Sequence, residues 1–360
     1  LRMSASANGI TTVSCSTDAF AALPASLVLD GALDADATTT GIARKLDNTS
    51  ASGGVVHNAG QPFTVQARAL TATGAVMSGY DGTPELSVAT CVLPSGCTPG
   101  ALTAPATAAV AGVYSNTAVS YAEVGAIALQ LQDLNYAAVD VADTAAASRE
   151  LRSVRVGVGR FVPDNYLLSV AKPGVLHTAN ASCTLAGAGY SFIGQGVGWA
   201  TAPTIQVTAR NAAGNTTTLW TGALMKLLPA HGTPKMSVSG AGAATLANTH
   251  GALAVADLGA GQASITAAND DLFTLGAAAP QASVTPTFAW ALQVTDTSEA
   301  GVAGNPTLGG SISNKPIGFD LGGLYHSGRL ALAGGHGDAR IGVRMLVQLQ
   351  RYTGTGWQTI

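Results

Sequence analysis

The sequence reads Gly82-Thr83-Pro84-Glu85-Leu86-Ser87-Val88 and, 150 residues further on, Gly232-Thr233-Pro234-Lys235-Met236-Ser237-Val238. A second matching pair lies upstream of these phrases: Val65-Gln66-Ala67-Arg68 and Val207-Thr208-Ala209-Arg210, 142 residues apart. Two matches in the same order and at nearly the same spacing predict a duplicated segment. Because domains commonly contain about 100–150 residues, the duplicated unit is predicted to be a whole domain.

The composition favours strands and turns over helices. Only 10% of the 360 residues are charged, whereas globular proteins average about 25%. The 44 glycines and the many Thr and Val residues are poor helix formers, because Gly loses backbone entropy and β-branched side chains lose rotamer freedom in a helix. The formal net charge of −3 provides no basic surface for nucleic acid. We therefore expect no nucleic-acid partner.

The hydrophobic pattern predicts an all-β chain of tandem immunoglobulin-like β-sandwiches. From Phe20 onward, short apolar runs are broken by turn residues every 8–12 positions, which is typical of a β-sandwich. In residues 63–70, the side chains of Phe63, Val65 and Ala67 alternate with polar ones and are predicted to face the core.

The same pattern divides the chain into four segments. These are the end of a preceding segment (1–19), a first sandwich (20–150), a second sandwich (151–310) and the start of a truncated third β-domain (311–360). Residues 154–162 are predicted to be the first strand of the second sandwich because they alternate and stop at Pro163. Residues 217–227 are predicted to be a strand within that sandwich. A hairpin of residues 325–332 and 341–352 is predicted to open the third domain.

Membrane and export signals are missing from this sequence. It has no run of 18 apolar residues, so no transmembrane helix is expected. Residues 1–4 lack the basic and apolar regions of a signal peptide. Both ends have the pattern of strands inside a domain, and we expect the chain to be an internal piece of a longer secreted protein.

The four cysteines indicate an oxidising compartment. Cys91 and Cys97 flank a Pro-Ser-Gly turn and are predicted to form a disulfide that closes a small loop. Zinc is the competing interpretation, but no second pair or nearby His completes four ligands. The partners of Cys15 and Cys183 stay open: they pair with each other, pair with cysteines outside the chain, or remain free.

The sequence contains no recognisable catalytic constellation, so we expect a protein that is not an enzyme. It lacks a Gly-x-Ser-x-Gly elbow and a phosphate-binding Gly-x-x-x-x-Gly-Lys-Ser/Thr loop. Its acidic groups are Asn269-Asp270-Asp271 and the series Asp133, Asp140 and Asp143. Calcium needs six to eight oxygen ligands, and neither group has the spacing of a dedicated loop. We expect both groups to lie in solvated turns. A calcium site is the alternative, and we expect no other cofactor.

Several phrases resemble those of the MshQ-like family of bacterial proteins, which are associated with type IV pili of the mannose-sensitive haemagglutinin class. They are found in residues 15–24, 59–64, 79–84, 121–125, 133–136, 158–164 and 325–332. The clearest is Val158-Gly159-Arg160-Phe161-Val162-Pro163-Asp164. The chain departs from the family pattern at residues 333–338 and 351–352, in the expected third domain. The resemblance implies an exported protein tied to pili or the cell surface, with no catalytic residues to carry over.

These observations lead to three hypotheses of different classes. The first is a non-enzymatic extracellular adhesin, or its stalk, on the bacterial cell surface or a pilus, with other surface proteins and a glycan or protein ligand as partners. The second is a subunit of an extracellular filament in which copies of the chain join through strand edges. The third, a sugar-binding module of a secreted enzyme, needs an exposed aromatic platform. The four tryptophans are instead expected in the core, one to a sheet: Trp199, Trp220, Trp290 and Trp357.

Overall fold

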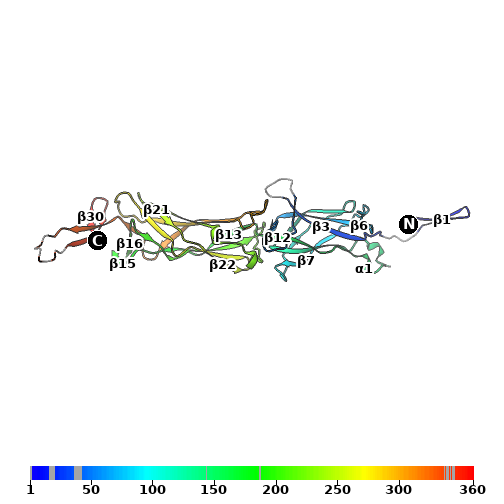
Figure 1. Ribbon diagram of the computed structural model, residues 1–360, viewed down its shortest axis with the longest axis horizontal. Coiled ribbons are helices and arrows are strands. Elements are labelled where there is room, and N and C mark those ends of the chain that lie inside the picture. The colour runs from blue at the N-terminus through cyan, green and yellow to red at the C-terminus, as the bar shows by residue number, and fades with distance from the viewer. Residues whose placement is uncertain are drawn as a thin grey trace.

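The computed structural model describes residues 2–15, 21–35, 43–142, 144–185, 188–335 and 345–360, together with 337, 340 and 342. The molecule is a rod in which two β-sandwiches follow each other along the long axis (Figure 1). The predicted all-β fold of tandem sandwiches is confirmed. No helix in the described part of the chain is long and apolar enough to cross a membrane.

The first sandwich consists of two facing sheets. One has the strand order β4-β3-β6-β9-β8 and the other β7-β10-β12-β5, with the short β11 also paired to β10. The strands of the first sheet are β3 (Ser26–Ala35), β4 (Ala43–Lys45), β6 (Pro62–Leu70), β8 (Leu102–Thr103) and β9 (Val113–Tyr121). The strands of the second are β5 (His57–Asn58), β7 (Glu85–Leu93), β10 (Gly125–Asp133), β11 (Leu151–Arg152) and β12 (Val156–Val162).

The core of the first sandwich follows from the alternation in the sequence. Phe63, Val65 and Ala67 of β6 are buried, as predicted, and they pack with Ile127 and Leu129 of β10. Every second residue of a strand points to the same face, so these two strands contribute a continuous apolar layer between the sheets. The far end of this sandwich contains a 3₁₀ turn (Ala138–Asp140) and a single helical turn, α1 (Ala146–Arg149).

The second sandwich repeats this arrangement. Its sheets have the orders β13-β19-β23-β22 and β18-β14-β26-β25-β20. The strands of the first are β13 (Asn165–Lys172), β19 (Thr204–Arg210), β22 (Ala254–Gly259) and β23 (Gln262–Thr266). The strands of the second are β14 (Val175–Leu176), β18 (Trp199–Thr201), β20 (Gly232–Ser239), β25 (Thr287–Asp296) and β26 (Leu308–Phe319).

The topology supports the duplication inferred from the two phrases. The first sheet runs β3-β6-β9-β8 in one sandwich and β13-β19-β23-β22 in the other, and residues 65–68 and 207–210 lie on the matching strands β6 and β19. In each copy the Gly-Thr-Pro phrase begins or directly precedes an edge strand, β7 or β20, that pairs antiparallel with β10 or β25. Each second sheet also contains one parallel pair, β5 with β12 and β14 with β26.

Two domain boundaries differ from the predicted ones. Strand β12 pairs with β10, and its Val158 and Phe161 lie in the first core, so residues 151–162 complete the first sandwich instead of opening the second. The boundary expected at residue 310 falls inside β26, which pairs with β25 and contributes Ile312 and Ile317 to the second core. Both errors arose because an alternating strand next to a turn does not reveal which sheet it joins.

One predicted strand is absent, and the expected placement of the tryptophans is corrected. Residues 217–227 form turns and a 3₁₀ helix (Gly222–Leu224), because Trp220 enters the core from a loop. Trp199 and Trp290 are buried as expected but share one sheet instead of occupying two. Trp357 is only half-buried and lies 4.2 Å from the Arg329 guanidinium.

Small sheets extend the rod at both ends. The hairpin of β1 (Arg2–Ala7) and β2 (Ile10–Cys15) lies beyond the first sandwich, and a sheet of β28 (Gly328–Ala333), β29 (Leu346–Tyr352) and β30 (Trp357–Thr359) lies beyond the second. The predicted hairpin near the C-terminus is therefore present. Two further sheets extend the second sandwich: β15 (Asn180–Leu185), β16 (Ala188–Phe192) and β27 (Leu324–His326), and β17 (Gly196–Val197), β24 (Leu272–Gly276) and β21 (Thr245–Thr249).

Candidate functional site

The polar residues that pair across the molecule gather where the two sandwiches meet. The first sandwich contributes the loop before β5, the β5–β6 turn, the β9–β10 turn and the end of β12. The second contributes the turn after β19 and the loop between β25 and β26. We call this region the junction and take it as the candidate functional site.

A buried ion pair spans the junction. Arg160 of β12, 1% exposed, donates from Nη2 to Oε2 of Glu299 at 2.5 Å, and the Glu299 side chain is 9% exposed. The same guanidinium donates to the carbonyls of Ala51 and Gly53. Removing two charges from water is costly, and the cost is offset only where their hydrogen bonds are made. The ion pair therefore ties the position of the β25–β26 loop to β12.

A second carboxylate holds the turn after β19. Glu123, 7% exposed, accepts hydrogen bonds from the backbone N–H and the hydroxyl of Thr218, at 2.7 and 2.9 Å, and from the Leu219 N–H at 3.2 Å. In the adjacent turn, the Ala212 N–H donates to the Ala59 carbonyl at 2.9 Å. These hydrogen bonds join backbone groups of the second sandwich to acceptors of the first, so they fix the relative position of the two turns.

Asn305 is the third polar anchor. Its Oδ1 accepts from the Val56 N–H at 3.0 Å and from Arg44 Nη1 at 2.9 Å, while its Nδ2 donates to the Gly54 carbonyl at 3.0 Å. One side chain of the second sandwich thus satisfies three groups of the first. Such a pattern requires a single relative placement of the two sandwiches.

Apolar contacts close the junction around these bonds. Val56, Ala59, Val124 and Val162 of the first sandwich belong to the buried core of the second. The interface is therefore continuous with a hydrophobic core, which distinguishes it from a flexible linker between independent domains.

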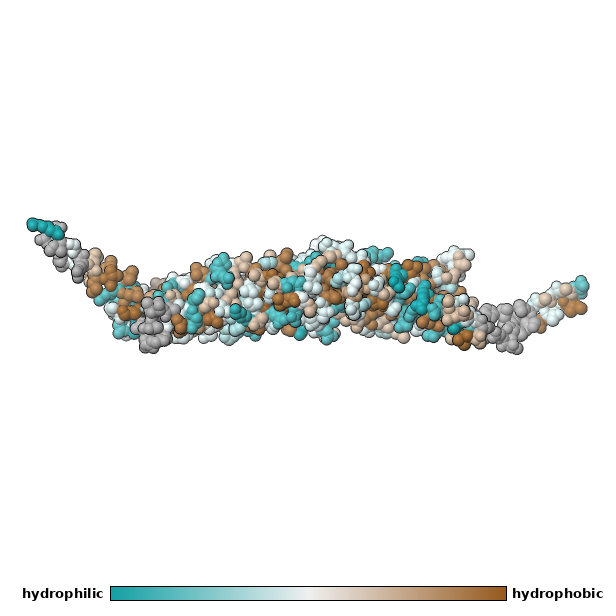
Figure 2. Space-filling view, turned by 90° about the horizontal axis from the view of Figure 1, so that it is seen from below, coloured by the Kyte–Doolittle hydropathy of each residue, from teal (hydrophilic) through white to brown (hydrophobic). Residues whose placement is uncertain are grey.

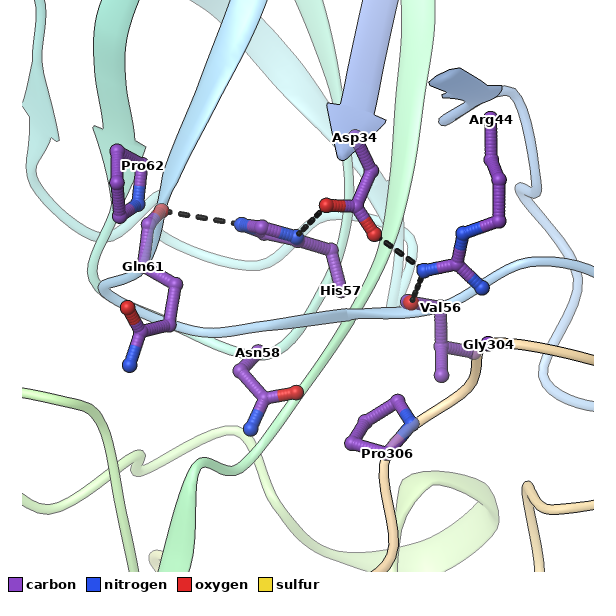
Figure 3. A pocket seen from close by; sticks show the side chains of 9 residues that line it. All are labelled: Asp34, Arg44, Val56, His57, Asn58, Gln61, Pro62, Gly304 and Pro306. Carbon is purple, nitrogen blue, oxygen red and sulfur yellow. Dashed lines mark hydrogen bonds and ion pairs between the residues drawn. The ribbon is translucent and has the colours of Figure 1, made fainter. Parts of the chain in front are cut away.

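A cavity of about 310 Å³ opens beside Asn305, lined by Asp34, Arg44, Val56, His57, Asn58, Gln61, Pro62, Gly304 and Pro306 (Figure 3). Asp34 and His57 are both 6% exposed. Asp34 Oδ2 pairs with Arg44, and Asp34 Oδ1 lies 3.1 Å from His57 Nδ1. The other ring nitrogen of His57 lies 3.1 Å from the Gln61 carbonyl oxygen. One wall of the cavity is therefore a hydrogen-bonded chain of fixed side chains.

The floor of the cavity is linked to the start of the second sandwich. Asn58 Nδ2 and Gln61 Nε2 both donate to Asp164 Oδ1, at 3.2 and 3.0 Å. Burial alone would raise the pKa of Asp164, but hydrogen bonds from Gln61, Asn165 and Asn58 outweigh it and lower the pKa below its ordinary value. Asp164 therefore stays ionised and holds the two carboxamides in place.

The predicted disulfide is present and lies on the first sandwich. Cys91 and Cys97 are bonded, with their Cα atoms 5.6 Å apart. Leu93, inside the closed loop, packs against the second core, so the loop borders the junction. The side chains of Cys15 and Cys183 lie outside the described residues, and their pairing stays a prediction.

The expectation of solvated turns is wrong for one carboxylate of each acidic group, because Asp133 and Asp271 are buried and accept hydrogen bonds inside the fold. Asp133 Oδ2 accepts from the Tyr80 hydroxyl at 2.7 Å, and its Oδ1 accepts from the N–H groups of Asn135 and Tyr136. Asp271 Oδ2 accepts from Trp199 Nε1 at 2.9 Å, and its Oδ1 accepts from the Gly251 N–H. Asp143 lies outside the described residues. Among those that are described, no three metal-ligating side chains come together.

Sequence reasoning missed the junction residues, although one signal was available. Arg160 lies two residues from both Val158 and Val162 in an alternating strand, so the sequence places it on the same face as these valines. A charge on the apolar face of a strand indicates a buried partner. The identity of that partner could not be read, because Glu299 is 139 residues away.

Comparisons with known proteins place these features in a family. Residues 123–315, more than half of the chain, match the family model of the third domain of DUF6701. No curated protein matches the chain.

Two solved structures are similar at low sequence identity. The Escherichia coli adhesin FdeC is 14% identical with a TM-score of 0.26, covering 86% of this chain and 74% of the FdeC chain. Dimeric latent PorU from Porphyromonas gingivalis is 12% identical with a TM-score of 0.23, covering 91% of this chain and 26% of the PorU chain. TM-scores this low carry no argument about function.

Proposed function

This chain belongs to the DUF6701 family, and we propose that it is a non-enzymatic stalk or adhesin of the bacterial cell surface, associated with type IV pili. The observation that carries the proposal is the junction: two sandwiches are joined end to end by a buried ion pair, shared hydrogen bonds and a common core. A stalk must keep a binding surface at a distance, and a hinge at this point would defeat that purpose. Figure 1 shows the two sandwiches in line with each other along one rod.

The phrases that resemble the MshQ-like family support the same proposal. Residues 158–164 contain Arg160 and Asp164, residues 59–64 contain Gln61, and residues 121–125 contain Glu123. All four residues make bonds at the junction. In this chain the phrases therefore coincide with the contacts that join the sandwiches, which is consistent with a mechanical role for them.

An extracellular location agrees with the disulfide. A bond between Cys91 and Cys97 persists in oxidising compartments and is rare in the cytosol. The proposed partners are therefore other surface or pilus proteins and a glycan or protein ligand outside the cell.

Imaging and adhesion assays test this function. Antibodies against the purified chain should label the surface or the pili of intact cells, and deletion of its gene should lower attachment to a glass or host-cell surface. Label confined to permeabilised cells, together with unchanged attachment, would contradict the proposal.

A second function, a filament subunit, is favoured by the sheet at the C-terminal end. Leu330, Leu332 and Val347 lie on one face of this sheet and are 69%, 62% and 57% exposed. Figure 2 shows apolar residues gathered at this end. Exposed apolar faces and free strand edges are typical sites of association. Electron microscopy of the concentrated chain distinguishes the two: regular fibres favour the filament, and separate rods favour the stalk.

A further inference from the structure

We propose that the junction cavity binds a neutral saccharide of one or two sugar rings. Its volume of about 310 Å³ lies at the lower end of the range found for small-ligand sites, about 300–1,000 Å³. Its position between two domains is also a common one for such sites. Size and place thus allow a ligand, and the lining residues decide its chemistry.

The charges of the cavity cancel. The carboxylate of Asp34 pairs with the guanidinium of Arg44, and His57 is held between Asp34 and a backbone carbonyl. A charged ligand would therefore gain no net attraction, because each charge on this wall is already paired with an opposite one. An uncharged, polar ligand fits this lining better than a carboxylate, a phosphate or an amine.

Unused hydrogen-bonding groups remain on the floor of the cavity. Asn58 and Gln61 each donate one amide hydrogen to Asp164. This bond orients each carboxamide and leaves its oxygen as an acceptor and its second N–H as a donor. Donors beside acceptors suit hydroxyl groups, since a hydroxyl both donates and accepts.

The remaining walls are apolar and flat. Pro62 comes from the first sandwich and Pro306 from the second. These surfaces match the C–H faces of a sugar ring. No Phe, Tyr or Trp is among the nine lining residues, so stacking is weaker than in an aromatic platform, and we expect low affinity for a single sugar.

The site depends on both sandwiches. Gly304 and Pro306 belong to the loop that Asn305 and Glu299 hold against the first sandwich. A bound saccharide would contact both sides of the junction and oppose its opening. The inference rests on the proposed surface function, because it supplies the ligand class for an adhesin.

Binding to the full 360-residue chain tests the site. The probes are methyl α-glucoside, methyl α-mannoside, methyl β-galactoside and N-acetylglucosamine, each at about 10 mM, well above the Kd of a weak site of about 1 mM. Saturation-transfer NMR detects contact, and titration gives the Kd. We expect at least one probe to bind, and binding to weaken about tenfold in Asn58→Ala or Gln61→Ala, the loss expected for one hydrogen bond to the ligand.

Two further variants separate the cavity from the fold. Pro306→Phe fills the cavity without removing a polar group and should abolish binding. Gln206→Ala removes a carboxamide from β19, away from the cavity, and should leave binding unchanged. Thermal unfolding of each variant verifies that it is folded.

Three outcomes overturn the site. These are failure of all four probes to bind, binding that survives Pro306→Phe in a folded protein, and equal losses in Gln206→Ala and Asn58→Ala. The proposed function has a separate test: cells whose attachment depends on the gene, but whose purified chain ignores these sugars, refute the saccharide site alone.

Discussion

At the scale of single residues, the junction gathers several of the buried charged side chains of the molecule. Arg160, Glu299 and Glu123 are buried at the junction, whereas pairs such as Arg152–Glu150 lie on the surface. Surface ion pairs contribute little, because water screens them and ordering long side chains costs entropy. A buried pair contributes mainly through the penalty for breaking it. The junction residues are therefore where single substitutions should have large effects.

Arg160→Ala is the first prediction. It leaves Glu299 buried without its cation and frees the carbonyls that Arg160 binds, so we expect a loss of about 3–5 kcal/mol in the free energy of unfolding. The matched control is Arg152→Ala, which breaks an exposed pair and should cost at most about 1 kcal/mol. Urea denaturation followed by fluorescence measures both. Equal losses in the two variants would show that the buried pair contributes no more to the free energy of unfolding than the exposed pair does.

The second prediction concerns His326, which is fully buried and within 2.6 Å of the Ser283 hydroxyl. Burial, and then the nearby Arg351 charge, lowers the pKa of His326 below its ordinary value of 6.5. The unfolded chain therefore binds the proton more readily, and stability present above pH 6.5 is lost as the pH falls below it.

The comparison that isolates this effect is wild type against His326→Asn, which keeps a partner for Ser283. Histidines beside carboxylates, such as His250 next to Asp271, contribute equally to both proteins. We expect the urea midpoint of the wild type to fall more steeply than that of the variant between pH 7 and pH 5. Parallel curves would mean that His326 is not buried in its neutral form.

At the scale of elements, the two sandwiches repeat one tight turn. Ala111-Gly112 leads into β9 and Ala260-Gly261 leads into β23, with φ of +51° and +80° in the first copy and +48° and +80° in the second. A Cβ at Gly112 would collide with the Met77 carbonyl, and one at Gly261 with the Thr217 carbonyl. The duplication has thus preserved a close approach between two backbones as well as the strand order.

The third prediction uses this turn. Gly261→Ala should destabilise the second sandwich more than Gly214→Ala does. Both glycines have φ near +80°, but the space around a Cβ at Gly214 is open. Gly214→Ala should therefore cost only the left-handed conformation, about 1 kcal/mol, and Gly261→Ala about twice that or more because of the clash. Thermal unfolding measures both variants. Equal losses of stability would contradict the close approach of Gly261 to the Thr217 carbonyl.

Strands could be predicted from the sequence, but their partners could not. Residues 63–70 were identified almost to the residue as β6, because one face is buried and the other is not. The strand predicted for residues 217–227 was wrong. An apolar run that enters the core from a loop has no periodicity that would distinguish it from a strand. The cavity could not be predicted from the sequence either, because Asp34, His57 and Gly304 are distant in the sequence and come together only in the fold.

At the scale of the whole molecule, the junction changes how the two sandwiches behave. Sandwiches joined by a linker move independently, and relative motion is the default for small polar interfaces between domains. Here Val56, Ala59, Val124 and Val162 enter the second core, so separation of the sandwiches would expose apolar surface and break buried polar bonds together. The mechanical unit is therefore the pair of sandwiches.

The last prediction follows from this coupling. Scanning calorimetry of the wild type should show one unfolding transition for both sandwiches, because unfolding of either one removes the partner surface of the other. The double variant Glu123→Ala/Asn305→Ala removes two anchors of the junction, so the buried Val56 N–H of the first sandwich and the Thr218 N–H of the second lose their acceptors. We expect its transition to split in two, with the lower midpoint several degrees below that of the wild type.

Arg152→Ala, which does not touch the junction, should keep a single transition. Two transitions in the wild type would mean that the sandwiches are independent, and a stalk built from them would bend where they meet.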